Sequence, residues 1–131
     1  MKHRILIVED NPPNRELLAD WLDAEGFEAA MATNLAEAFA ALEEGNIHAV
    51  LLDVQLGAED GLAVAARIRG DSALRDLPLI AVTAHAMVTD HERVLRAGCN
   101  ACISKPIDFR SLREELERWL DQPAYVPPVP T

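Results

Sequence analysis

Short apolar runs and helical apolar patterns alternate along the chain. Uninterrupted apolar runs are typical of strands that are buried on both faces of a sheet. Segments with strand character recur every roughly 20–30 residues, at 5–8, 27–32, 49–53, 79–83 and 101–104. Between them, apolar residues return at the spacing of one helix face. This alternation predicts an α/β fold, in which helices cover both faces of a parallel sheet.

Capping residues predict where several helices begin and end. Asn11 before Pro12 is a favourable helix start. Asn34 with Glu37 three residues later resembles a capping box. A third helix is expected to open with residues 59–61, and a fourth to span 86–97. Glycines at 26, 45 and 98 are expected to end helices.

Length and charge narrow the class of protein. A chain of 131 residues fits one domain, here expected over residues 1–121, and the prolines of 122–131 predict an extended tail or linker. The formal net charge of −10 argues against direct nucleic-acid binding. We found no apolar run near the ~20 residues that span a membrane and no signal peptide, so a cytoplasmic protein is expected.

Four of the five expected strands end in, or run directly into, polar residues: Glu9-Asp10, Asp53, Thr83 and Lys105. The carboxyl ends of parallel strands share one edge of the sheet, where ligands of such folds bind. Three carboxylates gathered there are costly without a cation, and an oxygen-only ligand set suits Mg²⁺. Lys105 can pair with Asp53 or with a phosphoryl oxygen, and Thr83 can donate a hydrogen bond. Each residue alone has a structural explanation, but together they predict a phosphoryl-transfer site with Asp53 as nucleophile.

These motifs closely resemble the receiver domain of bacterial two-component response regulators. The resemblance covers residues 4 to about 120 and is very specific in its order of motifs. They are Ile5-Leu6-Ile7-Val8-Glu9-Asp10-Asn11, Leu51-Leu52-Asp53-Val54-Gln55-Leu56, Asp60-Gly61, Val82-Thr83-Ala84 and Ser104-Lys105-Pro106. The resemblance implies a flavodoxin-like (βα)5 fold, a three-layer sandwich whose five-stranded parallel sheet has the order 2-1-3-4-5.

By this resemblance, Asp53 would accept a phosphoryl group from a phosphohistidine of a histidine kinase or a histidine phosphotransfer protein. Mg²⁺ or Mn²⁺ would be held by Asp10, Asp53 and the backbone carbonyl of Gln55, with Glu9 acting through water. Such a domain catalyses only its own phosphorylation and dephosphorylation. It works as a switch and not as a turnover enzyme.

The resemblance also implies which groups hold the phosphoryl group and start the switch. Lys105, Thr83 and the backbone N–H of Ala84 would bind its oxygens, and a cis peptide bond would precede Pro106. The family usually has Tyr or Phe three positions before the lysine, where a ring moves in response to the threonine. Cys102 stands there, so switching is expected to use backbone and helix shifts, or to be weak.

Other features leave alternatives open. Residues 57–59 replace the family's usual turn and are expected to loosen the loop after Asp53. The pair Cys99 and Cys102 is interpreted as two reduced thiols, because we found no further ligands at zinc-site spacing.

Three function hypotheses follow. The first is a stand-alone receiver that binds a downstream protein through the face of its fourth helix, fifth strand and fifth helix, with a homodimer through that face left open. The second is a receiver from a longer response regulator or hybrid kinase, with 122–131 as linker. The third, an aspartate-nucleophile phosphatase, is disfavoured because Gln55 stands where such enzymes need a proton-donating acid.

Overall fold

The computed structural model describes residues 2–84 and 88–120. Its central feature is a five-stranded sheet in the order β2-β1-β3-β6-β7, in which every neighbouring pair is parallel. The strands are β1 (Arg4–Val8), β2 (Glu28–Ala32), β3 (Ala49–Asp53), β6 (Leu79–Thr83) and β7 (Ala101–Ser104). Leaving out the two short strands β4 and β5, this order is 2-1-3-4-5. The predicted flavodoxin-like sheet is confirmed.

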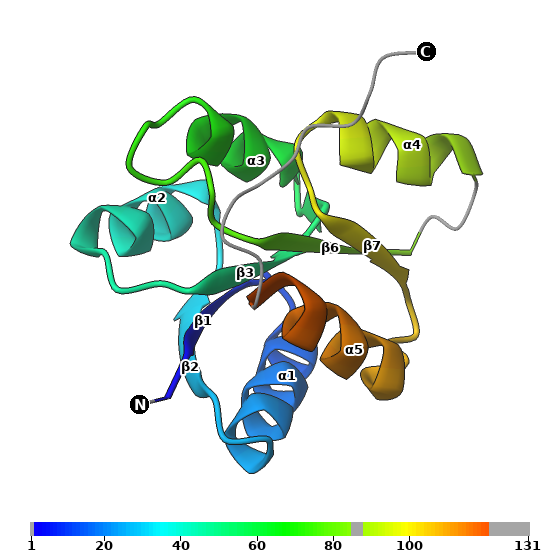
Figure 1. Cartoon of the computed structure of the whole chain (residues 1–131). Helices are drawn as coiled ribbons and strands as arrows, with labels where there is room; N and C mark the ends of the chain where they lie inside the picture. The colour runs from blue at the N-terminus through cyan, green and yellow to red at the C-terminus, as the bar shows by residue number, and fades with distance from the viewer. Residues whose placement is uncertain (1, 85–87, 121–131) are drawn as a thin grey trace.

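Helices cover both faces of this sheet (Figure 1). They are α1 (Pro12–Ala24), α2 (Leu35–Glu44), α3 (Leu62–Arg69), α4 (Val88–Arg96) and α5 (Phe109–Leu120). Leu22 of α1 and Leu116 of α5 pack in one buried cluster, whereas Leu42, Ile68 and Val94 of the other three helices pack in a second. The predicted three layers are therefore present. The predicted tail at 122–131 and the first two residues of the helix predicted at 86–97 lie outside the described residues.

The predicted helix caps form with one difference in detail. The Asn11 side chain accepts a hydrogen bond from the Asn14 N–H at 3.0 Å, and that of Asn34 accepts one from the Glu37 N–H at 2.8 Å. The Glu37 carboxylate accepts from the Thr33 N–H at 2.7 Å, one residue earlier than a capping box requires. Both helix starts are therefore set by local sequence.

The segment after β3 differs from the prediction. A helix was expected to open at residue 59, but β4 (Gln55–Leu56) and β5 (Glu59–Asp60) form an antiparallel pair and α3 begins at Leu62. Gly57 has a φ of +60°, while Ala58 is not among the positive-φ residues. This combination matches a type II′ turn, which holds two strands in a tight hairpin. The segment expected to be loose is thus a paired hairpin.

Arg69 at the end of α3 fastens the edge of the sheet opposite the carboxyl ends of the strands. Its guanidinium donates hydrogen bonds of 2.7–2.9 Å to the carbonyl oxygens of Gly98, Arg75 and Leu77 and to Oδ1 of Asn100. Asn100 Oδ1 also accepts from the Leu79 N–H at 2.8 Å. This cluster, the Arg69 clasp, joins the starts of β6 and β7 to α3.

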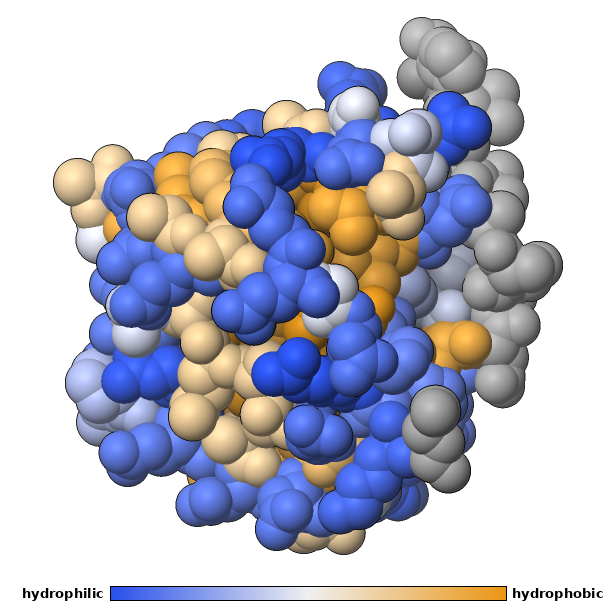
Figure 2. All heavy atoms as spheres, turned by 90° about the vertical axis from the view of Figure 1, so that its left-hand side faces the viewer, coloured by the Kyte–Doolittle hydropathy of each residue, from blue (hydrophilic) through white to orange (hydrophobic). Residues whose placement is uncertain are grey.

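Figure 2 shows the side of the molecule that lies at the left of Figure 1, where polar and apolar residues are mixed. The edge strand β2 exposes Met31, a residue that is 54 % exposed. Scattered apolar residues of this kind are usual on protein surfaces in contact with water. Among the described residues, no helix combines the length and apolar character needed to cross a bilayer.

Candidate functional site

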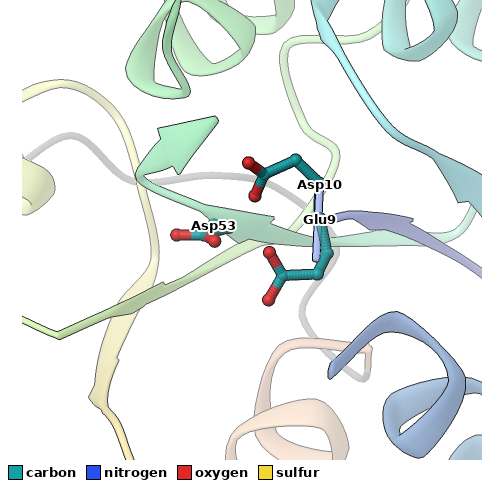
Figure 3. Close-up of side chains that lie close together, drawn as sticks. All are labelled: Glu9, Asp10 and Asp53. Carbon is teal, nitrogen blue, oxygen red and sulfur yellow. The ribbon is translucent and has the colours of Figure 1, made fainter. Parts of the chain in front are cut away.

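Three carboxylates meet at the carboxyl ends of β1 and β3 (Figure 3). Asp53 is the last residue of β3, and Glu9 and Asp10 directly follow the neighbouring strand β1. One oxygen from each lies within 4.8 Å of the others. Glu9 and Asp53 are only 2 % and 8 % exposed, whereas Asp10 faces solvent. The sheet therefore brings together the three acids that the sequence singled out.

The acidic cluster is electrostatically unfavourable as it stands. The pKa of Glu9 is raised from its ordinary value to about 7, chiefly by burial and also by a hydrogen bond and charge repulsion from Asp53, while Lys105 opposes the shift. A carboxyl shifted this far is about half protonated at neutral pH. The acidic cluster thus has an excess of negative charge, and its oxygen-only donor set fits a hard dication such as Mg²⁺.

Lys105 supplies the cation that these acids already contact. Its Nζ lies 3.2 Å from Glu9 Oε1 and 3.2 Å from Asp53 Oδ2. Burial would lower the pKa of Lys105, but the charges of Asp53 and Glu9 outweigh that effect and raise it. The ammonium therefore stays charged. The expected contact with Asp53 is present, and that with Glu9 was not anticipated.

Thr83 and Ala84 complete this edge of the sheet. Thr83 ends β6, is 2 % exposed and pairs in register with Ser104, the residue before Lys105. Its carbonyl oxygen accepts a hydrogen bond from the Lys105 N–H at 2.7 Å. Ala84 follows it and is exposed. The peptide bond from Lys105 to Pro106 is cis, as expected.

The turn after β3 holds Asp53 from two directions. The Gln55 N–H donates to Asp53 Oδ1 at 3.0 Å, and the Gly61 N–H donates to the Val54 carbonyl at 2.7 Å. A Cβ on Gly61 would lie 2.1 Å from the Asp53 carbonyl oxygen, well below any allowed contact. Only glycine permits this approach. Gly61 therefore fixes the backbone that carries Asp53.

The start of α1 holds Glu9 through contacts that could not be expected from residue types alone. Arg15 donates from Nη1 to the Glu9 carbonyl oxygen at 3.1 Å. The Asn11 N–H approaches Glu9 Oε2 at 3.5 Å. Both contacts depend on side-chain directions, although the helix start at Asn11 was predictable.

The position of the usual aromatic switch residue is occupied by a small thiol. Cys102 is half-buried and packs against the cluster that contains Val94 of α4. Burial raises its pKa, with a smaller contribution from the charge of Asp90, so it stays protonated at neutral pH. Cys99 is buried, and desolvation raises its pKa to about 12. Both cysteines are free, in agreement with their interpretation as reduced thiols.

A flavodoxin-like sheet with three carboxylates and a lysine at its carboxyl edge is the arrangement expected for a receiver domain. The family model described as response regulator receiver domain matches residues 5–117, and the chain belongs to this family. It is therefore a receiver of the two-component type, which is consistent with a phospho-acceptor role.

Individual relatives agree with this assignment. The polar-differentiation response regulator DivK of Brucella anthropi is 39 % identical over 120 residues, which cover 92 % of this chain and 98 % of that protein. The receiver domain of a sensor histidine kinase from Pseudomonas aeruginosa PAO1 has a TM-score of 0.84 at 32 % identity, with 93 % of this chain and 100 % of that chain covered. That structure has a magnesium ion coordinated in its active-site cleft. A CheY-like receiver domain protein from Methanospirillum hungatei JF-1 has a TM-score of 0.83 at 28 % identity, covering 92 % and 95 %.

Proposed function

We propose that Asp53 accepts a phosphoryl group from a phosphohistidine of a histidine kinase or a histidine phosphotransfer protein. The observation that carries this proposal is the meeting of Asp53 with two further carboxylates and the Lys105 ammonium at the carboxyl edge of the sheet. An oxygen of Asp53 attacks phosphorus while the bond from phosphorus to the imidazole nitrogen breaks. The imidazole leaves with that electron pair, and an acyl phosphate forms on Asp53.

The residues present fit a magnesium or manganese ion. Asp10, Asp53 and the backbone carbonyl of Gln55 would hold it, and Glu9 would act through water. When bound, the ion neutralises charge on the phosphoryl oxygens. The raised pKa of Glu9 supports this assignment, as does the magnesium ion in the related Pseudomonas receiver.

The remaining groups at this edge are suited to hold a phosphoryl group. Lys105 is charged and already within 3.2 Å of the acceptor carboxylate, so it can move to a phosphoryl oxygen. The Thr83 hydroxyl and the Ala84 N–H would donate to the others. Thr83 and Cys102 would then begin the conformational response, with Cys102 contributing space and not a moving ring.

The product is a switch state of the protein and not a released compound. The phosphorylated receiver would change its affinity for a cytoplasmic downstream protein through the face formed by α4, β7 and α5. Self-association through the same face would compete with that partner. The acyl phosphate is hydrolysed in time, which returns the switch to its resting state.

Labelling with acetyl phosphate tests the acceptor directly. We expect Mg²⁺-dependent incorporation of phosphate that is acid-stable, base-labile and lost in Asp53→Asn. Asp20→Asn makes the same chemical change at an exposed position on α1 and should label like the native protein. Equal labelling of Asp53→Asn would contradict the proposal. If acetyl phosphate labels nothing, a purified phosphorylated phosphotransfer protein is the decisive donor, and failure with it as well would also contradict the proposal.

A further inference from the structure

Helix α4 is attached to both sides of the site by polar contacts. His91 lies 3.2 Å from the Ser104 hydroxyl, measured from Nε2, in a partly buried position. Arg93 lies 3.7 Å from the Asp60 carboxylate, with both side chains more than half exposed. Exposed ion pairs of this kind contribute little stability. The contact of His91 with Ser104 is therefore the better candidate for coupling α4 to the site.

Ser104 adjoins two of the residues at the site. It immediately precedes Lys105, whose ammonium contacts Asp53, and it pairs in register with Thr83. Side chains alternate along a strand. Ile103 packs in the cluster under α1 and α5, while Cys102 packs in the cluster with α4. Ser104 therefore shares the α4 face with Cys102, and its contact with His91 agrees with that placement.

Cys102, the other residue on this face of β7, has too small a side chain to link the strand to α4 in the same way. Cys102 is small, half-buried and kept as a neutral thiol by its raised pKa. It fills space beside α4 through apolar packing. His91 has the longer reach and a directional contact.

We propose that the hydrogen bond between His91 and Ser104 is the contact through which phosphorylation of Asp53 is transmitted to α4. The inference rests on the proposed function, since it needs a phosphoryl group at Asp53. A phosphoryl oxygen lies farther from the β3 backbone than the carboxylate oxygen it replaces. Lys105 follows that oxygen outward, the end of β7 moves with it, and Ser104 shifts against His91. The helix then adjusts to keep or break this hydrogen bond.

The test compares α4 before and after phosphorylation in matched variants. His91→Ala and Ser104→Ala each remove one partner, and His91→Gln keeps a side chain of similar reach that can donate or accept a hydrogen bond. Glu92→Ala is the control, because it makes an alanine substitution at an exposed neighbouring position on the same helix. Each protein is incubated with Mg²⁺ and acetyl phosphate, label on Asp53 is quantified, and backbone hydrogen exchange is measured over Val88–Arg96.

In the native protein and in Glu92→Ala, we expect phosphorylation to change α4 exchange by about fivefold or more, the lower end of typical coupling. In His91→Ala and Ser104→Ala, label should be incorporated normally while α4 exchange stays within about twofold of the unlabelled protein, well below that coupling. His91→Gln should recover much of the response. A full α4 response in labelled His91→Ala and Ser104→Ala would overturn this inference alone. Absence of label in the native protein, with a phosphohistidine donor also supplied, would overturn the proposed function and this inference together.

Discussion

Binding of Mg²⁺ should release a proton from Glu9, and this proton can be measured. In the metal-free protein, burial and the neighbouring Asp53 raise the pKa of Glu9 to about 7. A dication held by the same cluster favours the ionised carboxylate, so the proton must leave as the ion binds. The apparent affinity for Mg²⁺ should therefore depend on pH in a range where ordinary carboxylates do not titrate.

The size of the effect follows from that pKa. At pH 8 about a tenth of Glu9 is protonated and at pH 6 about nine-tenths, so the apparent Kd should rise by about tenfold between them. Isothermal titration calorimetry in two buffers of different ionisation enthalpy measures both the Kd and the protons released. We expect about half a proton per ion at pH 7 and nearly a whole one at pH 6.

Glu9→Gln separates this group from all others that titrate nearby. The variant should bind Mg²⁺ with an affinity that is nearly independent of pH from 6 to 8, and with little dependence of the heat on the buffer. A native Kd that is flat across this range, or a slope that survives in Glu9→Gln, would refute the reasoning.

The same carboxyl should lower the stability of the metal-free protein as pH rises. A folded-state pKa above the unfolded value means that the folded protein binds the extra proton, so the contribution is fully present below about pH 4.5 and is lost as pH rises through 7. The loss is about 3 kcal/mol for a shift of this size. Denaturant titrations of the native protein and Glu9→Gln, with and without Mg²⁺, measure it, and the ion should remove most of the difference.

Two further substitutions test the backbone that holds the site and the far edge of the sheet. Gly61→Ala would force a Cβ against the Asp53 carbonyl oxygen, so we expect a loss of about 3 kcal/mol in denaturant unfolding together with weaker Mg²⁺ binding; native values of both would contradict the close approach. Arg69→Lys keeps the charge, but a lysine cannot reach all the acceptors of the Arg69 clasp. We therefore expect the free energy of unfolding to fall by about 2–3 kcal/mol, at about 1 kcal/mol per lost hydrogen bond. The Mg²⁺ affinity should not change, because the clasp lies at the opposite edge of the sheet from the site. A change below about 0.5 kcal/mol, the usual range for surface substitutions, would show that this cluster contributes little.

Apolar runs, helix-capping residues and the shared direction of parallel strands were enough to predict most of the fold. Each strand has a continuous or nearly continuous apolar run, and Asn11 and Asn34 cap their helices through hydrogen bonds to residues three positions away. The gathering of Glu9 and Asp53 followed from the parallel direction of their strands alone. These features need no knowledge of side-chain directions, which is why the sequence was sufficient for them.

The hairpin after β3 was missed for a physical reason. Residues 59–61 carry acids and a glycine before an apolar helical pattern, which is also what a helix start looks like. The deciding feature is the positive φ of Gly57, which closes a tight turn and lets β4 pair with β5. Gly57 departs from the family's usual turn, but a single glycine is compatible with both a loose loop and a type II′ turn.

Contacts between distant residues were also out of reach. Lys105 was expected to pair with Asp53, but its equal distance to Glu9 depends on the depth of all three side chains. The acceptors of Arg69 come from two loops whose course is set only by the folded chain. Patterns of residue type identify which groups take part in a site, while the distances between them require the structure.

The Arg69 clasp holds the start of β7 in place, whereas the end of the strand lies at the site. Hydrogen bonds hold Asn100 against Leu79 and α3, while Lys105 at the other end lies in the site. The strand between them extends over about 16 Å, at roughly 3.3 Å per residue. A displacement of about 1 Å at Lys105 then requires a rotation of only about 4° about the clasped end. The residues between Asn100 and Lys105 move in proportion to their distance from Asn100, so Ser104 moves about four-fifths as far as Lys105 and Cys102 about two-fifths as far.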